Sequence, residues 1–359
     1  MASQRTSAIA QAGAVSQALV GGPLGQQQGN RYTARPAILS AAAAFLGVSA
    51  LSGVAADAET SAPVQVADDP YARPAAAQPL PSKITLYQYE VCPYCCKVRA
   101  MLDYYKLPYT VIEVNPLTKG ELKWSTYKKV PVVKLDEEVV VDSSAIMSRL
   151  ATDVAASRPA PAAAAAPAAP KKPSGGFSFF GSSGCSDESA VKDQGAANFA
   201  GPALEEEVKW RKWVDQTFVK VLTANIYRNW DEALETFKYI TDQTSWSWGT
   251  RELARWSGAV IMWQVGKKMP KKYGIEGDLR LALYAAADDF VENGLRGRTF
   301  AGGAEPNLAD VALFGVVRAV RQTGAFRDLM AQSKLAPWFQ AMEERVGDSA
   351  RVATVMGSM

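Results

Sequence analysis

Histidine is absent from this chain of 359 residues. Without an imidazole there is no serine–histidine or cysteine–histidine catalytic pair, no zinc site with histidine ligands and no histidine to ligate haem iron directly. Cysteine is scarce too: there are four, and three of them lie between positions 92 and 96. That distribution excludes a disulfide framework and indicates a catalytic or metal site in a reducing compartment.

A strong net charge is also missing, since 39 basic and 36 acidic residues leave a formal charge of +3. We therefore expect no nucleic-acid partner, which would require a clearly basic surface. A hydrophobic content of 48% is enough for a sizeable core. The length favours two folded domains with additional segments.

The first 56 residues lack both aspartate and glutamate, while Arg5, Arg31 and Arg35 stand among alanine, serine, glutamine and glycine. This composition is typical of a mitochondrial or chloroplast transit peptide. We place this targeting segment at residues 1–36.

Residues 37–56 contain no charge at all. Twenty uncharged residues are long enough to span a bilayer as a helix. We therefore predict a single N-terminal anchor in an organelle membrane, either mitochondrial or chloroplast. The alternative is a cleaved signal segment, with Ala56-Asp57-Ala58 as the processing site.

Two stretches have too few large apolar residues to form a core. Residues 57–82 are rich in proline and alanine and indicate an extended tether. Residues 153–202 are rich first in alanine and proline and then in glycine and serine, which indicates a disordered linker. Cys185 lies in this linker, apart from the other cysteines, so we expect no metal site. The folded domains are predicted at residues 83–152 and 203–350.

The chemistry is predicted at the motif Cys92-Pro-Tyr-Cys95. A short apolar run at residues 84–87 indicates a buried strand before this motif, and a helical pattern follows it. At such a junction the unpaired N–H groups and the positive end of the helix dipole favour a thiolate at Cys92. Lys97 and Arg99 add positive charge nearby. The layout is that of a thioredoxin-like redox or thiol site.

The elements that follow Ile84 have the order of a thioredoxin-like, glutaredoxin-type α+β domain. A β-α-β half is followed by a β-β-α half. We expect these elements at residues 84–87, 93–105, 109–114, 132–135, 139–141 and 143–152.

Two features beside these elements concern a ligand. Val130-Pro131 falls just before the third strand, where a cis proline facing the cysteines leaves the preceding backbone free for a peptide-like ligand. Asp142-Ser143-Ser144 begins the next helix. These residues form either an ordinary N-cap or a cradle for the carboxylate of glutathione. The shared order and spacing of the three motifs favour the glutathione site.

Beyond Pro202 the pattern is helical. An apolar stripe with three- and four-residue spacing runs from Trp210 to Asn225. We interpret the nine tryptophans, all beyond residue 120, as core packing because they follow the apolar stripes. Asn307 and Asp310 form a predicted capping box with a structural role. Further helices are expected at residues 231–241, 251–269, 278–293, 307–322, 325–332 and 337–346.

Short motifs are spread over both predicted domains. They are Tyr87-Gln-Tyr89, Cys92-Pro-Tyr-Cys95-Cys-Lys-Val-Arg99, Leu107-Pro-Tyr109, Glu113-Val-Asn-Pro116, Lys129-Val-Pro131, Asp142-Ser-Ser144, Lys209-Trp-Arg-Lys-Trp213, Asn225-Ile-Tyr-Arg228 and Pro306-Asn-Leu-Ala-Asp310. Together they resemble the glutathione transferase superfamily and, within it, the membrane-associated type 2 prostaglandin E synthases. The resemblance covers residues 83–350 apart from the linker. It implies a thioredoxin-like domain followed by an all-helical domain of the glutathione transferase C-terminal type.

The resemblance also implies roles for particular residues. Cys92 would be the reactive thiol, Tyr89 a phenol beside it, and Cys95 the second cysteine of the pocket. Cys96, which extends the motif to three thiols, should point elsewhere and serve in packing.

A bound glutathione would contact the other half of the predicted site. The backbone of Val130, next to cis Pro131, would pair with its cysteinyl part. Asp142 and Ser143 would hold its γ-glutamyl end.

The implied activity is isomerisation of a prostaglandin H endoperoxide. The thiol of Cys92, helped by the Tyr89 hydroxyl, would polarise the peroxide and give the 9-keto, 11-hydroxy product without net redox change. Haem bound with glutathione, whose sulfur would ligate the iron, would redirect the reaction to fragmentation. Members of this family commonly form homodimers, so the resemblance also implies a homodimer.

Two other functions are compatible with these residues. One is a glutathione-dependent thiol–disulfide oxidoreductase or transferase that uses Cys92 and Cys95 as a redox pair. The other is a haem- or glutathione-binding scaffold at an organelle membrane.

Overall fold

The computed structural model describes residues 67–116, 118–157, 202–243 and 246–356. The predicted targeting segment, the predicted anchor at residues 37–56 and the linker residues 158–201 with Cys185 lie outside this part. Among the described helices, none is both long enough and apolar enough to cross a bilayer.

The first domain is built on a five-stranded sheet with the order β4-β3-β1-β2-β5. β1 and β2 are parallel, whereas β3 runs antiparallel to both β1 and β4. This confirms the thioredoxin-like arrangement predicted from the sequence. The strands are β1 (Ile84–Gln88), β2 (Tyr109–Glu113), β3 (Val132–Leu135), β4 (Glu138–Val141) and β5 (Arg351–Met356).

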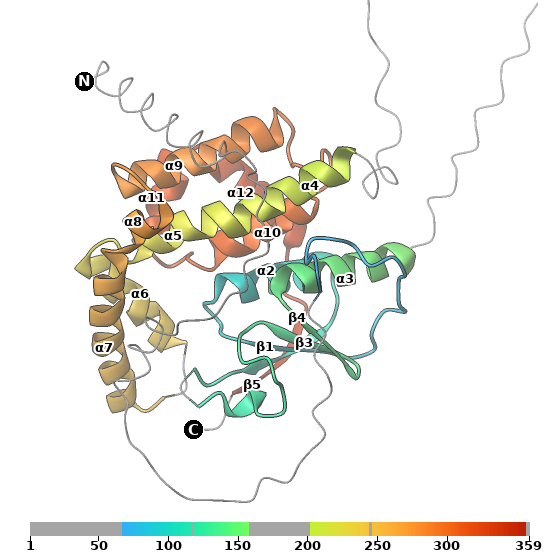
Figure 1. Ribbon diagram of the computed structural model, residues 1–359, viewed down its shortest axis with the longest axis horizontal. Coiled ribbons are helices and arrows are strands. Elements are labelled where there is room, and N and C mark those ends of the chain that lie inside the picture. Colours follow the sequence, from blue (N-terminus) through green and yellow to red (C-terminus); the bar gives the residue numbers. More distant parts are fainter. Residues whose placement is uncertain (1–66, 117, 158–201, 244–245, 357–359) are drawn as a thin grey trace, which may run out of the picture.

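Helices α2 (Pro93–Tyr105) and α3 (Ser143–Ser157) lie between the sheet and the second domain (Figure 1). The central strand β1 is buried along its whole length, because its side chains meet covering elements on both faces. The apolar faces of α2 and α3 join it in one core. This burial fixes the end of β1, and therefore the place where the cysteine motif begins. A short 3-10 helix, η2 (Gly120–Leu122), lies between β2 and β3.

Strand β5 was not predicted from the sequence, which placed the end of the helical domain at residue 350. It returns from the helical domain and pairs in parallel with β2, with Arg351 opposite Tyr109. Figure 1 shows this red strand beside the blue and green strands of the first domain. Most of its side chains are exposed, so it carries little of the burial pattern by which strands are recognised.

The second domain is all-helical, as predicted. The expected helix at 251–269 runs from Trp248 to Gly266, and a separate short helix begins at Met269. The expected helix at 278–293 passes into a π-helical turn after Asp289, and another π-helical turn interrupts the first long helix. The elements are α4 (Pro202–Trp213), η4 (Val214–Phe218), α5 (Val219–Ile226), α6 (Trp230–Asp242), α7 (Trp248–Gly266), α8 (Met269–Tyr273), α9 (Leu279–Asp289), η5 (Phe290–Leu295), α10 (Leu308–Arg318), α11 (Gly324–Gln332) and α12 (Ala336–Val346).

Aromatic side chains pack the centre of the helical domain. Phe290 contacts Trp210 and Trp338 edge to face, each with ring centroids 5.3 Å apart. The prediction that tryptophans serve the core is confirmed for these residues. It is wrong for Trp248 and Trp256 on α7, whose side chains are 74% and 52% exposed, because the outer face of α7 has no covering element among the described residues.

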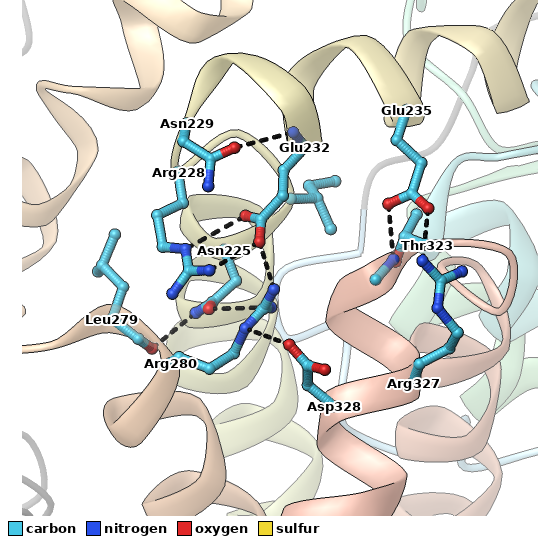
Figure 2. Close-up of polar contacts among 12 residues, drawn as sticks. Asn225, Arg228, Asn229, Glu232, Glu235, Leu279, Arg280, Thr323, Arg327 and Asp328 are labelled. Atoms are coloured by element: carbon cyan, nitrogen blue, oxygen red, sulfur yellow. Dashed lines mark hydrogen bonds and ion pairs between the residues drawn. The ribbon is translucent and has the colours of Figure 1, made fainter.

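Polar side chains also join the helices (Figure 2). Buried Asn225 on α5 donates a 2.8 Å hydrogen bond to the Leu279 carbonyl at the start of α9. Arg280, one residue later, pairs with Glu232 on α6 and Asp328 on α11. Asn225 and Arg280 together therefore join α5, α6, α9 and α11.

The predicted capping box at Asn307 and Asp310 is confirmed. The Asp310 carboxylate is fully buried and also accepts hydrogen bonds from Ala301 N–H, Gly302 N–H and the Trp338 indole. Its role in holding the loop before α10 is structural.

The two domains meet where α10 crosses α2. At Gly315 a methyl group would lie 2.5 Å from the Cα of Lys97 and 2.6 Å from the Cys96 carbonyl oxygen. Only glycine allows this approach. The helical domain is thereby pressed against the helix that carries the cysteines.

The described end of the predicted tether, residues 67–82, packs against both domains. Tyr71 is buried and donates a hydrogen bond to Asp215. Arg73 pairs with buried Glu207 on α4, and Gln78 N–H donates to Asp153 on α3. These contacts were not predicted from the sequence, which indicated an extended tether.

Candidate functional site

The cysteine motif lies in a tight turn between β1 and α2. The Cys92 N–H donates to the Tyr89 carbonyl oxygen at 3.0 Å, which closes the turn. Pro93 occupies the first turn of α2, where its missing N–H leaves no helical bond unmade. Cys92 is partly exposed, whereas Cys95, one turn further along, is fully buried.

The turn shifts the pKa values of Cys92 and Cys95 in opposite directions. A hydrogen bond from the Cys95 thiol lowers the pKa of Cys92; burial opposes this, and the N–H groups of Cys95 and Tyr94 lower it further. Burial and the charge on Cys92 raise the pKa of Cys95 well above its usual value. The turn therefore favours a thiolate at Cys92 and a thiol at Cys95.

The two neighbouring cations contribute less than the sequence suggested. The Lys97 ammonium is buried, pairs with Asp215 and donates to the Ser144 hydroxyl at 3.0 Å. Arg99 pairs with Glu90 and lowers the pKa of Cys92 only after the hydrogen bonds described above. The helix N-terminus and Cys95, rather than free positive charge, favour the thiolate.

Tyr89 lies three residues before Cys92 in the same turn. Burial, and then the negative charge of the Cys92 thiolate, raise the pKa of Tyr89 to about 12. Its phenol is therefore protonated at neutral pH and is available as a hydrogen-bond or proton donor.

Cys96 points away from the cysteine pair, as predicted. Its Sγ accepts a 2.8 Å hydrogen bond from Arg99 Nη2 and lies 3.5 Å from the Glu90 carbonyl oxygen. Burial raises the pKa of this thiol, which suits a packed structural position.

The predicted glutathione motifs are brought to the same end of the sheet as the cysteines. The Val130-Pro131 bond is cis, as expected. It directly precedes Val132, which pairs with Tyr87 on one side and with Val141 on the other. The strands therefore place Val130-Pro131 between the cysteine turn and the start of α3.

At the start of α3, Asp142 acts as a cap. Its carboxylate accepts hydrogen bonds from Ser144 N–H at 2.8 Å and Ala145 N–H at 3.2 Å, and its own φ is +72°. The N-cap interpretation is therefore confirmed. The Ser143 hydroxyl forms no hydrogen bond within the described residues, so the end of α3 keeps a donor for an anion.

Two residues of the site were missed from the sequence. Asp215, in the π-helical turn η4, accepts hydrogen bonds from Ser144 and Tyr71 as well as from Lys97. Burial, and then the charges of Asp215 and Cys92, raise the pKa of Tyr94 to about 12, so this phenol is protonated at neutral pH. A π-helical turn often marks a functional site but leaves no sequence signature of its own.

Within the described residues, no group of histidine, cysteine, aspartate and glutamate side chains could hold a metal ion. The available donors are a thiolate, two phenols, backbone groups and a helix N-terminus. This set suits an organic ligand with a carboxylate and a thiol, such as glutathione.

A thioredoxin-like domain with a cysteine turn and a cis proline, packed on an all-helical domain, defines a glutathione transferase-like protein. Residues 86–158 match the family model described as glutathione S-transferase, N-terminal domain. Among solved structures, poplar glutathione transferase F1 is similar, with a TM-score of 0.42, 16% identity and coverage of 73% of this chain and 92% of that one.

Two curated relatives are more similar in sequence. Prostaglandin E synthase 2 of Danio rerio is 37% identical over 269 residues, which cover 73% of this chain and 71% of that protein. Prostaglandin E synthase 2 of Mus musculus is 35% identical over 289 residues, which cover 78% and 75%. The chain belongs to the prostaglandin E synthase 2 family.

Proposed function

We propose that this protein is a thiol-dependent isomerase that converts a prostaglandin H endoperoxide to the 9-keto, 11-hydroxy product. The names of its curated relatives support the substrate class. The observation that carries the chemistry is the turn closed by the 3.0 Å hydrogen bond from Cys92 N–H to the Tyr89 carbonyl oxygen, in which the pKa of Cys92 is lowered and that of Tyr89 is raised. A base and an acid thus belong to the same turn.

The two groups are sufficient for a balanced reaction. The Cys92 thiolate accepts the proton from the ring carbon that becomes the ketone, and the released electron pair forms the carbonyl as the O–O bond breaks. Tyr89 gives its proton to the oxygen that remains on the other ring carbon. The proton on Cys92 then returns to Tyr89, so no electrons are gained or lost.

Glutathione would bind beside this pair. The backbone at Val130, the N-terminus of α3 and the free Ser143 hydroxyl would hold its peptide and carboxylate groups. Bound glutathione supplies a second thiol next to Cys92. Asp142, already committed to capping α3, would act by keeping that helix end in place.

Haem is part of the proposal only together with glutathione. The chain has no histidine, and its Cys92 thiolate is already hydrogen-bonded by Cys95 and backbone N–H groups. The chain itself offers no imidazole for haem iron, so the sulfur of bound glutathione would have to hold the iron there. A Soret band that appears only when both compounds are added would support this, and a band with haem alone would contradict it.

A second function is favoured by the hydrogen bond between Cys92 and Cys95. A low-pKa thiol next to a buried partner is the arrangement of a thiol–disulfide oxidoreductase. In that role Cys92 would attack the glutathione sulfur of a glutathionylated substrate and release the substrate thiol. Cys95 or a second glutathione would then break the resulting Cys92–glutathione disulfide. If neither activity is found, a haem- or glutathione-binding scaffold remains the third proposal.

One set of assays separates these functions. Each protein is given either prostaglandin H or a mixed disulfide of glutathione, and the products are identified by mass spectrometry. The proteins are the full chain and its Cys92→Ser, Cys95→Ser and Tyr89→Phe variants. The isomerase requires Cys92 and Tyr89 and works without glutathione, whereas the oxidoreductase requires Cys92 and glutathione. Unchanged turnover of prostaglandin H by Cys92→Ser would refute the isomerase mechanism.

We also propose an organelle membrane as the location, mitochondrial or chloroplast, on the composition of residues 1–56. Fractionation of cells that express the full chain with a C-terminal tag tests this. Removal of residues 1–56 should release the protein from the membrane fraction, and its retention there would contradict the anchor. Cross-linking tests the homodimer.

A further inference from the structure

The turn that carries Cys92 is held by a residue 261 positions further along the chain. Arg351, the first residue of β5, places its Nη2 atom 3.1 Å and 3.0 Å from the two carboxylate oxygens of Glu90. Glu90 lies inside the turn, between Tyr89 and Cys92. The end of the helical part of the chain therefore reaches back to the predicted reactive thiol.

Glu90 uses every polar group that it has. Its N–H donates to Glu113 at the end of β2 at 2.7 Å, and its carbonyl oxygen accepts from Arg99 Nη2 at 2.6 Å. Its carboxylate pairs with Arg99 and with Arg351. Three elements, β2, α2 and β5, thus fix this residue from different sides.

Arg351 is itself firmly placed. Asp103 on α2 accepts hydrogen bonds from the Ser349 hydroxyl at 2.9 Å and the Ala350 N–H at 3.0 Å. Lys106 donates to the carbonyl oxygens of Val346 and Asp348. Four residues of the segment from the end of α12 to β5 are therefore anchored at the C-terminal end of α2.

The two neighbouring carboxylates, Glu90 and Glu113, explain why a second cation is needed here. Glu90 lies beside Glu113, and buried Gln88 donates its amide to both carboxylates. Burial alone would raise the pKa of Glu90, but Arg99 and Arg351 lower it below its usual value. Burial raises the pKa of Glu113. Two adjacent carboxylates would repel each other without the second cation.

We propose that Arg351 is a positioning residue of the site, which holds Glu90 and thereby sets the geometry of Tyr89 and Cys92. Movement of the turn would shift the Cys92 thiolate relative to the N–H groups of α2 and the Tyr89 phenol relative to the substrate. The effect on turnover rests on the proposed function, but the effect on Cys92 itself does not.

The test measures the rate at which iodoacetamide alkylates Cys92 as a function of pH. The full chain is used, and the Cys92 peptide is quantified by mass spectrometry. The variants are Arg351→Gln, Arg351→Lys and Glu90→Gln. Arg345→Gln is the matched control, because Arg345 forms an exposed ion pair with Glu305 six residues before Arg351 and outside the site.

We expect Arg351→Gln and Glu90→Gln to move the alkylation midpoint upward, toward the ordinary value of cysteine, because the thiolate loses aligned N–H donors. Arg351→Lys should retain part of the wild-type behaviour, since it keeps the charge but not the rigid planar guanidinium. Turnover should fall about tenfold in kcat with little change in KM.

Arg345→Gln should leave both readouts unchanged. The melting temperature shows which variants are folded. A folded Arg351→Gln or Glu90→Gln protein whose Cys92 midpoint equals that of the wild type would overturn the proposal. A shifted midpoint in a protein that does not turn over prostaglandin H would support the positioning role while rejecting the proposed substrate.

Discussion

Gly315 on α10 lies directly against the backbone of Lys97 on α2, so close that a methyl group would stand 2.5 Å from the Lys97 Cα. The neighbouring atoms are backbone, which cannot move aside as a flexible side chain can. At this position only glycine lets the helical domain come so close to the cysteine helix.

Gly315→Ala should accordingly destabilise the protein by about 1–3 kcal/mol, because α2 and α10 must separate. Urea unfolding measures this loss. Gly249→Ala is the control: a methyl group at Gly249 has no atom within 4 Å, and α7 should gain stability from alanine or stay unchanged. Equal effects of the two substitutions would contradict the close contact.

Cys95 should control the reactivity of Cys92. Since the pKa of Cys92 is lowered, its alkylation by iodoacetamide should persist below about pH 8.5, the ordinary value for cysteine. Cys95→Ala removes the largest cause and should move the midpoint upward, whereas Cys95→Ser keeps a donor and should move it less. If both variants gave the wild-type midpoint, the hydrogen bond would have no part in the shift.

Turnover should rise with pH through the pKa of Cys92 and then stay level to about pH 10, because the pKa of Tyr89 is raised to about 12. Tyr89→Phe should lower kcat by about a hundredfold across that range, as expected for loss of a proton donor. A pH–rate profile of both proteins provides the check. A decline in wild-type turnover between pH 8 and 9 would show that another acid is used.

Asp310 should be essential for the helical domain. Asp310→Ala leaves the donors of Ala301, Gly302, Asn307 and Trp338 without their buried acceptor, which should cost several kcal/mol in total at about 1–3 kcal/mol each. Thermal unfolding measures the loss. Asp310→Asn keeps one oxygen and should be milder, and a harmless Asp310→Ala would show that the loop finds other partners.

Tyr71 should attach the segment before β1 to the helical domain. Tyr71→Phe keeps the buried ring and removes the 3.0 Å hydrogen bond to the Asp215 carboxylate, so we expect a loss of about 1.5–3 kcal/mol. The comparison variant is Arg327→Gln, which breaks the exposed pair with Glu235 and should change stability by less than about 1 kcal/mol. Chemical denaturation measures the free energy of unfolding of both variants. A loss in Tyr71→Phe no larger than that in Arg327→Gln would contradict the prediction.

The sequence predicted the cysteine turn and its neighbours because their signals are local. A strand, a proline after the first cysteine and a helical pattern within some twenty residues define the Cys92 site. Val130-Pro131 and Asp142-Ser143 likewise lie next to their own strands. Burial of those strands then brings the motifs together, as the predicted fold requires.

The contacts that join distant parts of the chain were not predictable in the same way. Asp215 and Arg351 are ordinary surface-type residues until the fold places them against Lys97 and Glu90. Nothing in the local pattern marks them, because their partners lie more than a hundred positions away. The exposed side chains of β5 hid the strand for a related reason.

The position of β5 determines when the first domain can be completed during synthesis. The central strands of this domain leave the ribosome early. Pairing of β5 with β2 and the ion pair between Arg351 and Glu90 can form only after the entire helical domain has been translated. A nascent chain can therefore form the core of the first domain while its thiol turn is still loosely held. Until the second domain has been made, the ion pair between Arg351 and Glu90 cannot form, and the turn with Cys92 lacks this support.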